Sequence, residues 1–402
     1  MSKKPDITEQ TDPTKQPADL DEAYHSRVIR GLIGPILPYY YCDPDDPDPE
    51  AHARAEAVTE IMINGPNEIY IENEEGMTLR PELSFAAERD LIALARAILQ
   101  FVGKRLVPEE LSVEARTPEG HRVHIVQSPA ARPGLSIAIR KFPSNRVRMA
   151  DLTGRFQSFP ARVAEYFEHA MRMKSNILVS GGTGSGKTTM VNALSELIDP
   201  KDRIIIIEDA TEIRFDDNRH VLQFESVKPD REGRGGITIR ELLRASLRMR
   251  PDRVVIGECR GGEALDMVQA MNTGHAGSMS TIHANSPEDC LARLETLCLM
   301  AGVNIPLVAL QRQAAAAIDT IVQVARWHGK KRVVGITEVR GFDIDRGRYE
   351  LVPIFVLTPN PEGPNGFSLD WTGADPKLGE ADLGEGAKLG TLWQVAQAKG
   401  AS

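Results

Sequence analysis

Short continuous apolar runs alternate with amphipathic stretches over the second half of the chain. The continuous runs predict buried strands, and the apolar residues between them recur at helical spacing. The predicted strands span residues 176–180, 203–208, 253–257 and 278–282. The predicted helices span 187–198, 239–249 and 261–273, with further helical segments near 287–301 and 306–317. Strands that alternate with helices in this way predict a parallel sheet with helices on both faces.

The remaining apolar patterns are shorter and predict hairpins. In the first half, strands at 59–66 and 69–71 flank an Asn-Gly-Pro-Asn turn, and a helix is predicted over 91–102. A second hairpin and a last strand are predicted at 113–116, 122–126 and 135–142. This mixture indicates a small α+β domain. Beyond the parallel sheet, segments 321–327 and 332–339 predict one more hairpin across Gly329.

Polar and proline-rich stretches divide the chain into five predicted parts. Residues 1–50 are expected to be a disordered or linker region with a short helical segment, because they include a polar start and the acidic, proline-rich run 43–50. The small α+β domain would span 51–142, and 143–159 would link it to an α/β domain over 160–358. Residues 359–402 are rich in glycine and proline and are expected to form a weakly ordered tail.

Composition changes this picture little. The chain has 402 residues and a formal net charge of −9, which argues against wholesale binding of nucleic acid or of anionic membranes. No signal-like start and no apolar run near the roughly 20 residues of a spanning helix are present in the sequence. We therefore expect a cytoplasmic protein that is peripheral to a membrane. The four cysteines form no C-x-x-C pair, so neither a zinc site nor a disulfide framework is indicated.

The segment with the clearest chemistry follows the first predicted strand of the α/β domain. It fits the phosphate-loop pattern G-x-x-x-x-G-K-[ST], and it lies between a strand and a helix as that pattern requires. Its backbone N–H groups can surround phosphates, Lys187 can reach the β- and γ-phosphates, and the Thr188 hydroxyl can hold Mg²⁺. We expect ATP and Mg²⁺ as cofactors. The predicted nucleotide-binding residues are Gly181, Gly182, Thr183, Gly184, Ser185, Gly186, Lys187, Thr188 and Thr189.

Acids and a histidine follow three other predicted strands, where ligands of parallel sheets bind. Glu208 could hold Mg²⁺ through water or position the attacking water, or it could be a capping or solvated acid. Glu258 stands where the acid of a Walker B motif is expected, and could coordinate Mg²⁺, polarise the water, or do both. His283 is a candidate sensor of the γ-phosphate, and otherwise a structural histidine.

The chemistry also requires a positive charge that stabilises the transferred phosphoryl group, and a neighbouring subunit often supplies it. Arg116, Arg122 and Arg140 lie on predicted strands of the first domain. Arg140 is included among the candidate catalytic residues, with Glu258, Glu208, Lys187 and His283.

Taken together, these segments resemble the Walker A, Asp box, Walker B and His box of the secretion ATPase superfamily, which drives type II secretion, type IV pili and type IV secretion or conjugation. The boxes are 181–188, 208–212, 254–258 and 281–285. Segments 58–66, 248–253 and 261–275 are most similar to the CpaF-type ATPases of tight-adherence (Flp) pili. The four-cysteine zinc insertion typical of type II exporters is absent from the sequence, which points away from that branch.

The resemblance implies a fold and a role. The fold would be a RecA-like P-loop NTPase domain with a parallel sheet, preceded by a smaller PAS-like α+β domain. The role would be a homo-hexameric ATPase that powers pilus assembly or protein secretion through an inner-membrane platform protein. The alternatives are a conjugation or type IV secretion ATPase, a DNA-stimulated RecA-like motor, and a module that binds ATP without hydrolysing it.

Overall fold

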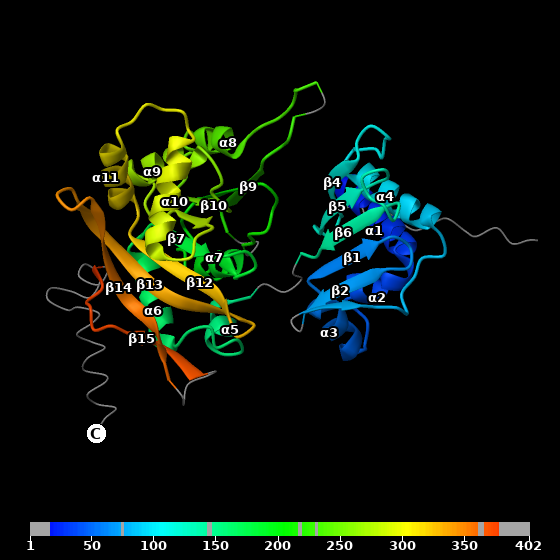
Figure 1. Cartoon of the computed structure of the whole chain (residues 1–402), viewed down its shortest axis with the longest axis horizontal. Helices are drawn as coiled ribbons and strands as arrows, with labels where there is room; N and C mark the ends of the chain where they lie inside the picture. Colours follow the sequence, from blue (N-terminus) through cyan, green and yellow to red (C-terminus); the bar gives the residue numbers. More distant parts are fainter. Residues whose placement is uncertain are drawn as a thin grey trace, which may run out of the picture. The chain divides into compact units, whose positions relative to one another are not determined.

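The computed structural model describes residues 17–73, 76–142, 147–215, 219–229, 232–360 and 366–377. The chain divides into two compact units between residues 145 and 146 (Figure 1). Each unit has its own hydrophobic core, as expected for a chain of this length. Residues 1–16 of the predicted N-terminal tail lie outside the described residues.

The first unit is built on a six-stranded antiparallel sheet in the order β3-β2-β1-β6-β5-β4. Its strands are β1 (Glu60–Asn64), β2 (Ile69–Asn73), β3 (Gly76–Leu79), β4 (Ser112–Arg116), β5 (Arg122–Val126) and β6 (Ser136–Arg140). The predicted hairpins β1–β2 and β4–β5 are both present. Only β3, which has no strong apolar alternation, was missed. Helix α4 (Glu88–Phe101) packs its apolar face, including Leu91, Leu94 and Ile98, into the core of this unit.

Residues before the first strand are part of this core, contrary to the expectation for 1–50. They form α1 (Pro17–Leu32), a 3₁₀ turn (Gly34–Ile36), α2 (Leu37–Tyr40) and α3 (Pro49–Ala57). Ile29 near the end of α1, Ile33 directly after it and Ile36 of the 3₁₀ turn are all fully buried. The Tyr40 hydroxyl donates to Glu119 Oε2 over 2.6 Å. The last residues of the acidic run 43–50 start α3, with Asp48 as its N-cap.

The second unit contains a nine-stranded sheet in the order β15-β14-β13-β12-β7-β11-β10-β8-β9. The six strands from β12 to β9 are parallel, and β13 to β15 extend the sheet as antiparallel strands. The parallel strands are β7 (Ile177–Gly181), β8 (Ile204–Glu208), β9 (Val221–Glu225), β10 (Arg253–Ile256), β11 (Met279–Ile282) and β12 (Thr320–Trp327). The antiparallel strands are β13 (Lys330–Asp343), β14 (Arg348–Pro359) and β15 (Phe367–Trp371).

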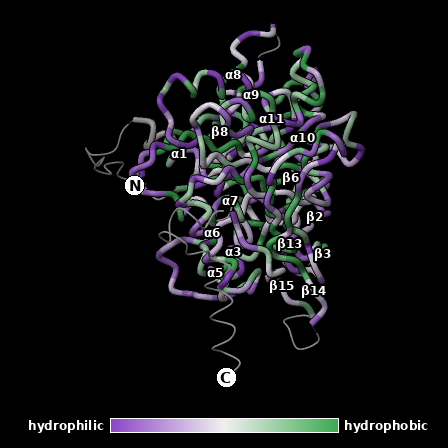
Figure 2. The backbone as a smooth tube through the Cα atoms, turned by 90° about the vertical axis from the view of Figure 1, so that its left-hand side faces the viewer, coloured by the Kyte–Doolittle hydropathy of each residue, from purple (hydrophilic) through white to green (hydrophobic). Residues whose placement is uncertain are grey.

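Helices cover both faces of this sheet, which confirms the predicted α/β architecture. Successive residues of β8 alternate between two cores: Ile204 and Ile206 pack on one side, and Ile205 and Ile207 on the other. These isoleucines form one of the apolar segments of the tube in Figure 2. The helices are α5 (Met149–Thr153), α6 (Ala161–Arg172), α7 (Lys187–Ser195), α8 (Ile239–Ser246), α9 (Glu263–Asn272), α10 (Pro287–Leu299) and α11 (Leu307–Ala317).

The predicted bounds of the α/β domain, 160–358, are too narrow at both ends. Met149, Leu152 and Phe159 of the expected linker are buried in the core of the second unit. At the other end, β15 pairs with β14 although 359–402 was expected to be weakly ordered, and Leu369 packs into the same core. The pairing with β14 supplies backbone partners to a short strand that has little apolar signal of its own. Residues 378–402 lie outside the described residues.

Candidate functional site

The phosphate-loop segment lies between β7 and α7, where its glycines are required by the backbone. A Cβ on Gly181 would stand 2.4 Å from the Val324 carbonyl oxygen and 2.5 Å from Ser185 Oγ. Gly184 and Gly186 have φ angles of 68° and 98°, in the left-handed region that side chains disfavour. The loop then enters α7 directly, so the N-terminal amides of that helix face the loop. This is the geometry that cradles phosphate groups.

Lys187 is held at this loop by several contacts. Its Nζ donates to the carbonyl oxygens of Gly181 and Gly182 over 3.0 and 2.9 Å, and it lies 3.2 Å from His283 Nδ1. The side chain is only 8% exposed. The ammonium group is therefore placed within the phosphate-loop cradle, as its sequence position predicted.

Glu258 and His283 come together because their strands are neighbours. β10 and β11 run parallel, with Ile256 opposite Ser280, so the residues that follow them emerge at the same edge of the sheet. His283 Nε2 lies 2.9 Å from Glu258 Oε1. Since His283 also contacts Lys187, the structure joins three predicted site residues, Lys187, His283 and Glu258, in one continuous chain.

Arg260 completes this cluster, and the sequence analysis did not single it out. Its Nη2 donates to Glu258 Oε2 over 2.8 Å, and its Nη1 lies 3.6 Å from Asp209 Oδ2. Burial raises the pKa of Glu258, but the hydrogen bond and charge of Arg260, with the charge of Lys187, hold that pKa below its usual value. Glu258 is therefore ionised at neutral pH. The signal for Arg260 in the sequence was its position, two residues after the acid that follows a strand.

Burial and the charge of Lys187 lower the pKa of His283, although Glu258 acts in the opposite direction. A neutral imidazole fits the contacts on both sides of the ring. Its Nδ1 can accept from the Lys187 ammonium while its Nε2–H donates to Glu258. The histidine thus connects the phosphate loop to the acid.

Glu208 is buried and bound to the backbone that follows it. Its Oε1 accepts from the N–H groups of Glu212 and Ile213 over 3.1 and 3.2 Å. A Cβ on Gly257 would lie 2.8 Å from Glu208 Cγ, so the glycine before Glu258 makes room for this side chain. Glu208 holds the segment after β8 in place next to Glu258, and its predicted part in hydrolysis stays a prediction.

The hydroxyl groups and amides expected to hold ATP and Mg²⁺ surround the same loop. Gly182, Thr183 and Gly184 are exposed, and Thr188 and Thr189 on the first turn of α7 are partly exposed. Ser185 Oγ instead donates to the Gly182 carbonyl over 2.8 Å and so closes the loop. A threonine hydroxyl and an ionised carboxylate are oxygen donors suited to Mg²⁺, which is coordinated by few protein ligands and retains water. The residues present fit the predicted cofactors.

Arg140 belongs to the first unit, where it is part of a row of arginines. Arg116 faces Arg122 across β4 and β5, and Arg122 faces Arg140 across β5 and β6. Arg140 Nε also lies 3.9 Å from Glu60 Oε1, and more than half of its side chain is exposed. The three candidate arginines therefore share one face of the sheet.

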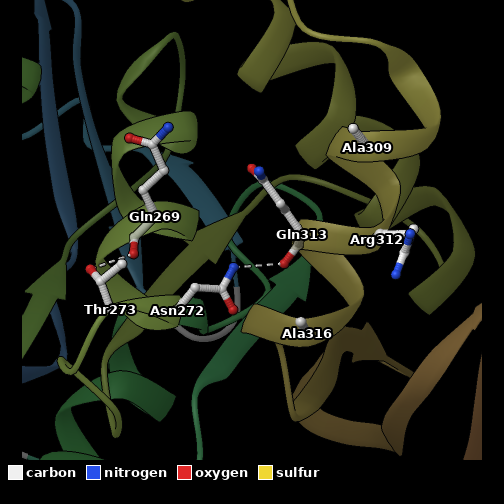
Figure 3. A pocket seen from close by; sticks show the side chains of 7 residues that line it. All are labelled: Gln269, Asn272, Thr273, Ala309, Arg312, Gln313 and Ala316. Carbon is white, nitrogen blue, oxygen red and sulfur yellow. Dashed lines mark hydrogen bonds between the residues drawn. The ribbon is translucent and has the colours of Figure 1, made fainter.

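A separate surface pocket lies between α9 and α11 (Figure 3). Asn272 Nδ2 donates to the Gln313 carbonyl over 2.9 Å and connects the two helices. No predicted site residue is among the side chains that line this pocket. The lining residues are Gln269, Asn272, Thr273, Ala309, Arg312, Gln313 and Ala316.

Comparison with known proteins identifies the family to which this chain belongs. Residues 45–346 match the model of the family described as type II/IV secretion system protein. The chain belongs to this family. It is 35% identical over 305 residues to the type IV secretion system protein PtlH of Bordetella pertussis. This match covers 69% of this chain and 89% of PtlH. It is 30% identical over 333 residues to VirB11 of Brucella suis, with coverage of 76% and 88%.

A third relative is the conjugal transfer protein TrbB of Rhizobium radiobacter, which is 32% identical over 292 residues, or 71% of this chain and 84% of TrbB. Solved structures share the fold. The Yersinia pseudotuberculosis ATPase DotB matches with a TM-score of 0.53 at 19% identity, covering 76% of this chain and 82% of DotB. The pilus retraction motor PilT with bound ADP matches with a TM-score of 0.50 at 21% identity, covering 75% and 81%. The predicted superfamily and the RecA-like fold with an additional N-terminal domain are thereby confirmed.

Among the described residues, no helix has both the length and the apolar character needed to cross a membrane.

Proposed function

We propose that this protein hydrolyses Mg-ATP and uses the energy to drive a secretion or pilus machine at the inner membrane. The observation that supports this most directly is the connected set Lys187, His283 and Glu258 at the phosphate loop. A loop that only binds nucleotide does not require an ionised acid beside it. An ionised carboxylate that can hold the metal ion and orient water, at the same edge of the parallel sheet, is what hydrolysis needs.

Each residue of the site then has a distinct part. The loop amides and Lys187 bind the phosphates, and the Thr188 hydroxyl and Glu258 carboxylate hold the metal ion. Mg²⁺, when bound, neutralises charge on the phosphate oxygens. Glu258 orients and polarises the attacking water, and Glu208 keeps the segment beside it in place. His283 responds to the γ-phosphate, because a change in its contact with Lys187 alters its contact with Glu258.

Charge that develops on the transferred phosphoryl group requires a further cation. Arg140, with Arg116 and Arg122 beside it, supplies this charge to the site of an adjacent subunit in a homo-hexamer. Hydrolysis then changes the contact between subunits, and the ring transmits this change to an inner-membrane platform protein. The protein is cytoplasmic and reaches the membrane through that partner.

The relatives PtlH, VirB11 and TrbB bear names from type IV secretion and conjugal transfer, whereas segments 58–66 and 248–253 are most similar to CpaF-type pilus ATPases. Protein export or pilus assembly therefore ranks before a nucleic-acid motor, in agreement with the net charge of −9. Stimulation of ATP hydrolysis by DNA that weakens steeply with salt would reverse this ranking.

Phosphate release tests the proposed activity. The full-length protein should release phosphate from ATP only with Mg²⁺ present, and Lys187→Ala should lose ATP binding and release together. Light scattering with and without ATP measures the assembly state. A wild-type protein that binds ATP without releasing phosphate, in its assembled form, would reduce the function to nucleotide binding.

A further inference from the structure

We propose that Gln323 of β12 is a positioning residue that holds His283 over the phosphate loop. This inference rests on the proposed function, since it assigns a further residue to the same site. Gln323 belongs neither to the phosphate-loop pattern nor to the boxes that follow it. It acts through the carbonyl group of Ala284, the residue directly after His283.

Strand order brings Gln323 to the segment that follows β11. The strands β12, β7 and β11 are neighbours in the sheet, with β7 in the middle. Ser180 of β7 is opposite Gln323 on one side and opposite Ile282 on the other. Side chains at opposed positions point to the same face of a sheet, so these three residues share one face. The chain leaves β11 after Ile282, at the level of Gln323.

Two side chains donate to the carbonyl oxygen of Ala284. Gln323 Nε2 lies 3.2 Å from this oxygen, and Ser180 Oγ lies 3.4 Å from it. Because the donors come from β12 and β7, the segment after β11 is held over the end of β7, where the phosphate loop begins. His283 stands directly before this carbonyl group, and its Nδ1 lies 3.2 Å from Lys187 Nζ. The two donors therefore hold the backbone that carries the histidine.

The strands around Gln323 favour this direction of its side chain. The pairing of β12 with β13 shifts register between Gln323 and Val324, and irregularities of this kind re-aim side chains next to active sites. Gly335, which is opposite Gln323 on β13, has no side chain, and Ser180 on the β7 side is small. The long glutamine therefore has small neighbours on both adjoining strands.

The amide of Gln323 contributes little to folding. The side chain is 7% exposed, and its Oε1 is buried without a hydrogen-bond partner among the described residues. A buried acceptor without a partner destabilises the folded state. The reverse orientation of the amide would place Oε1 against the Ala284 carbonyl oxygen, so that two acceptors face each other. The bond to Ala284 is therefore the interaction that this buried amide makes, and it supports the segment of His283.

The test uses Gln323→Met, which keeps the length of the side chain and removes its donor. Ser180→Ala removes the other donor to the same carbonyl group and is an independent second variant. The matched control is Thr320→Val at the start of the same strand. Thr320 is also buried, and its Oγ1 lies 2.9 Å from the Tyr166 hydroxyl oxygen, so the control loses a buried hydrogen bond that does not involve Ala284.

Labelling with diethyl pyrocarbonate, which reacts with neutral imidazole nitrogens, measures whether His283 is held. The full-length protein is labelled without nucleotide and analysed by mass spectrometry, with His124, an exposed histidine of the first unit, as internal reference. We expect Gln323→Met to increase labelling of His283 about two- to tenfold, the effect of one lost hydrogen bond, and Ser180→Ala to increase it less. Thr320→Val should leave this labelling unchanged.

Steady-state kinetics give a second readout that separates positioning from folding. Gln323→Met should lower kcat for phosphate release about two- to tenfold, with the dissociation constant of ATP within about twofold of wild type. Its melting temperature should be close to that of wild type, because the variant removes an unpaired acceptor together with the donor. Thr320→Val should keep the wild-type kcat.

Equal labelling of His283 in wild type and Gln323→Met would overturn the inference, as would an equal increase in Thr320→Val. If Gln323→Met does not fold, the labelling of Ser180→Ala decides. Failure of the proposed function gives a different result. If wild type releases no phosphate, or labelling of His283 rises while kcat is unchanged, Gln323 still holds the histidine and the assumed part of His283 in hydrolysis is wrong.

Discussion

His283 Nε2 lies 2.9 Å from Glu258 Oε1, and these two residues follow neighbouring parallel strands. The contact joins an acid suited to orient water with a histidine that also touches the phosphate-loop lysine. In the function that we propose, this contact would let the state of the γ-phosphate alter the acid.

Glu258→Gln should abolish turnover while binding is kept. Glutamine preserves the shape of the side chain, but it cannot accept a proton or carry the charge that polarises water. We expect phosphate release to fall by about 10²- to 10⁴-fold, the contribution of a general base, with the ATP affinity close to wild type. Single-turnover phosphate release and an ATP titration measure the two quantities. Glu168→Gln, an exposed acid on α6, is the control. Wild-type hydrolysis by Glu258→Gln would remove the acid from the mechanism.

Arg260→Gln should move the acid limb of the pH–rate profile to higher pH. Arg260 is the main group that holds the pKa of Glu258 down against the effect of burial. Without it the carboxylate takes up a proton at a higher pH, so kcat/KM should begin to fall at a higher pH than in wild type. Arg260→Lys, which retains the charge, should shift the limb less. The idea fails if the limb of Arg260→Gln coincides with that of wild type.

Gly181→Ala and Gly182→Ala should have different effects on stability. The new methyl group at 181 would collide with the Val324 carbonyl and Ser185, whereas no atom lies within 4 Å of one at 182. We expect Gly181→Ala to lose about 1–3 kcal/mol of unfolding free energy, as for an overpacked core, and Gly182→Ala to stay near wild type. Urea unfolding followed by circular dichroism measures both. Equal stability of the two variants would contradict the close contact between β7 and β12.

The sequence predicted the parts of the site that consist of residues close together along the chain. The glycine loop, its lysine and the strand that precedes it occupy one continuous segment, and Glu258 and His283 each end a buried apolar run. Their contact was not predictable, because it depends on β10 and β11 being neighbours in the sheet. Arg260 was missed for the same reason, since a single arginine has no periodicity and its role depends on the residues that lie beside it in the fold.

The errors in the fold have a related cause. Helix α1 and strand β15 have weak patterns of their own and become ordered by burial against elements that are distant in sequence. Ile29 and Ile33 enter the core of the first unit, and Leu369 enters that of the second. Tertiary packing outweighs local propensity at such chain ends. The central strands were predicted well because four successive isoleucines in β8 require burial on both faces.

Lys141 should make the stability of the first unit depend on pH above 8. Its Nζ donates to the carbonyl oxygens of Tyr39 and Ala55 over 2.9 and 2.6 Å, and burial lowers its pKa from 10.5 to about 8, although the charge of Glu56 opposes this. Between pH 8 and 10.5 the unfolded chain therefore binds more protons at this lysine than the folded one, so stability rises with pH across that window. Lys141→Met lacks this rise. Melting temperatures of wild type and variant at pH 7.5, 9 and 10.5 should thus diverge in favour of wild type as the pH increases, while Lys104→Met, which changes a more exposed lysine, follows wild type. Parallel curves for wild type and Lys141→Met would show that the ammonium group is not desolvated in the folded protein.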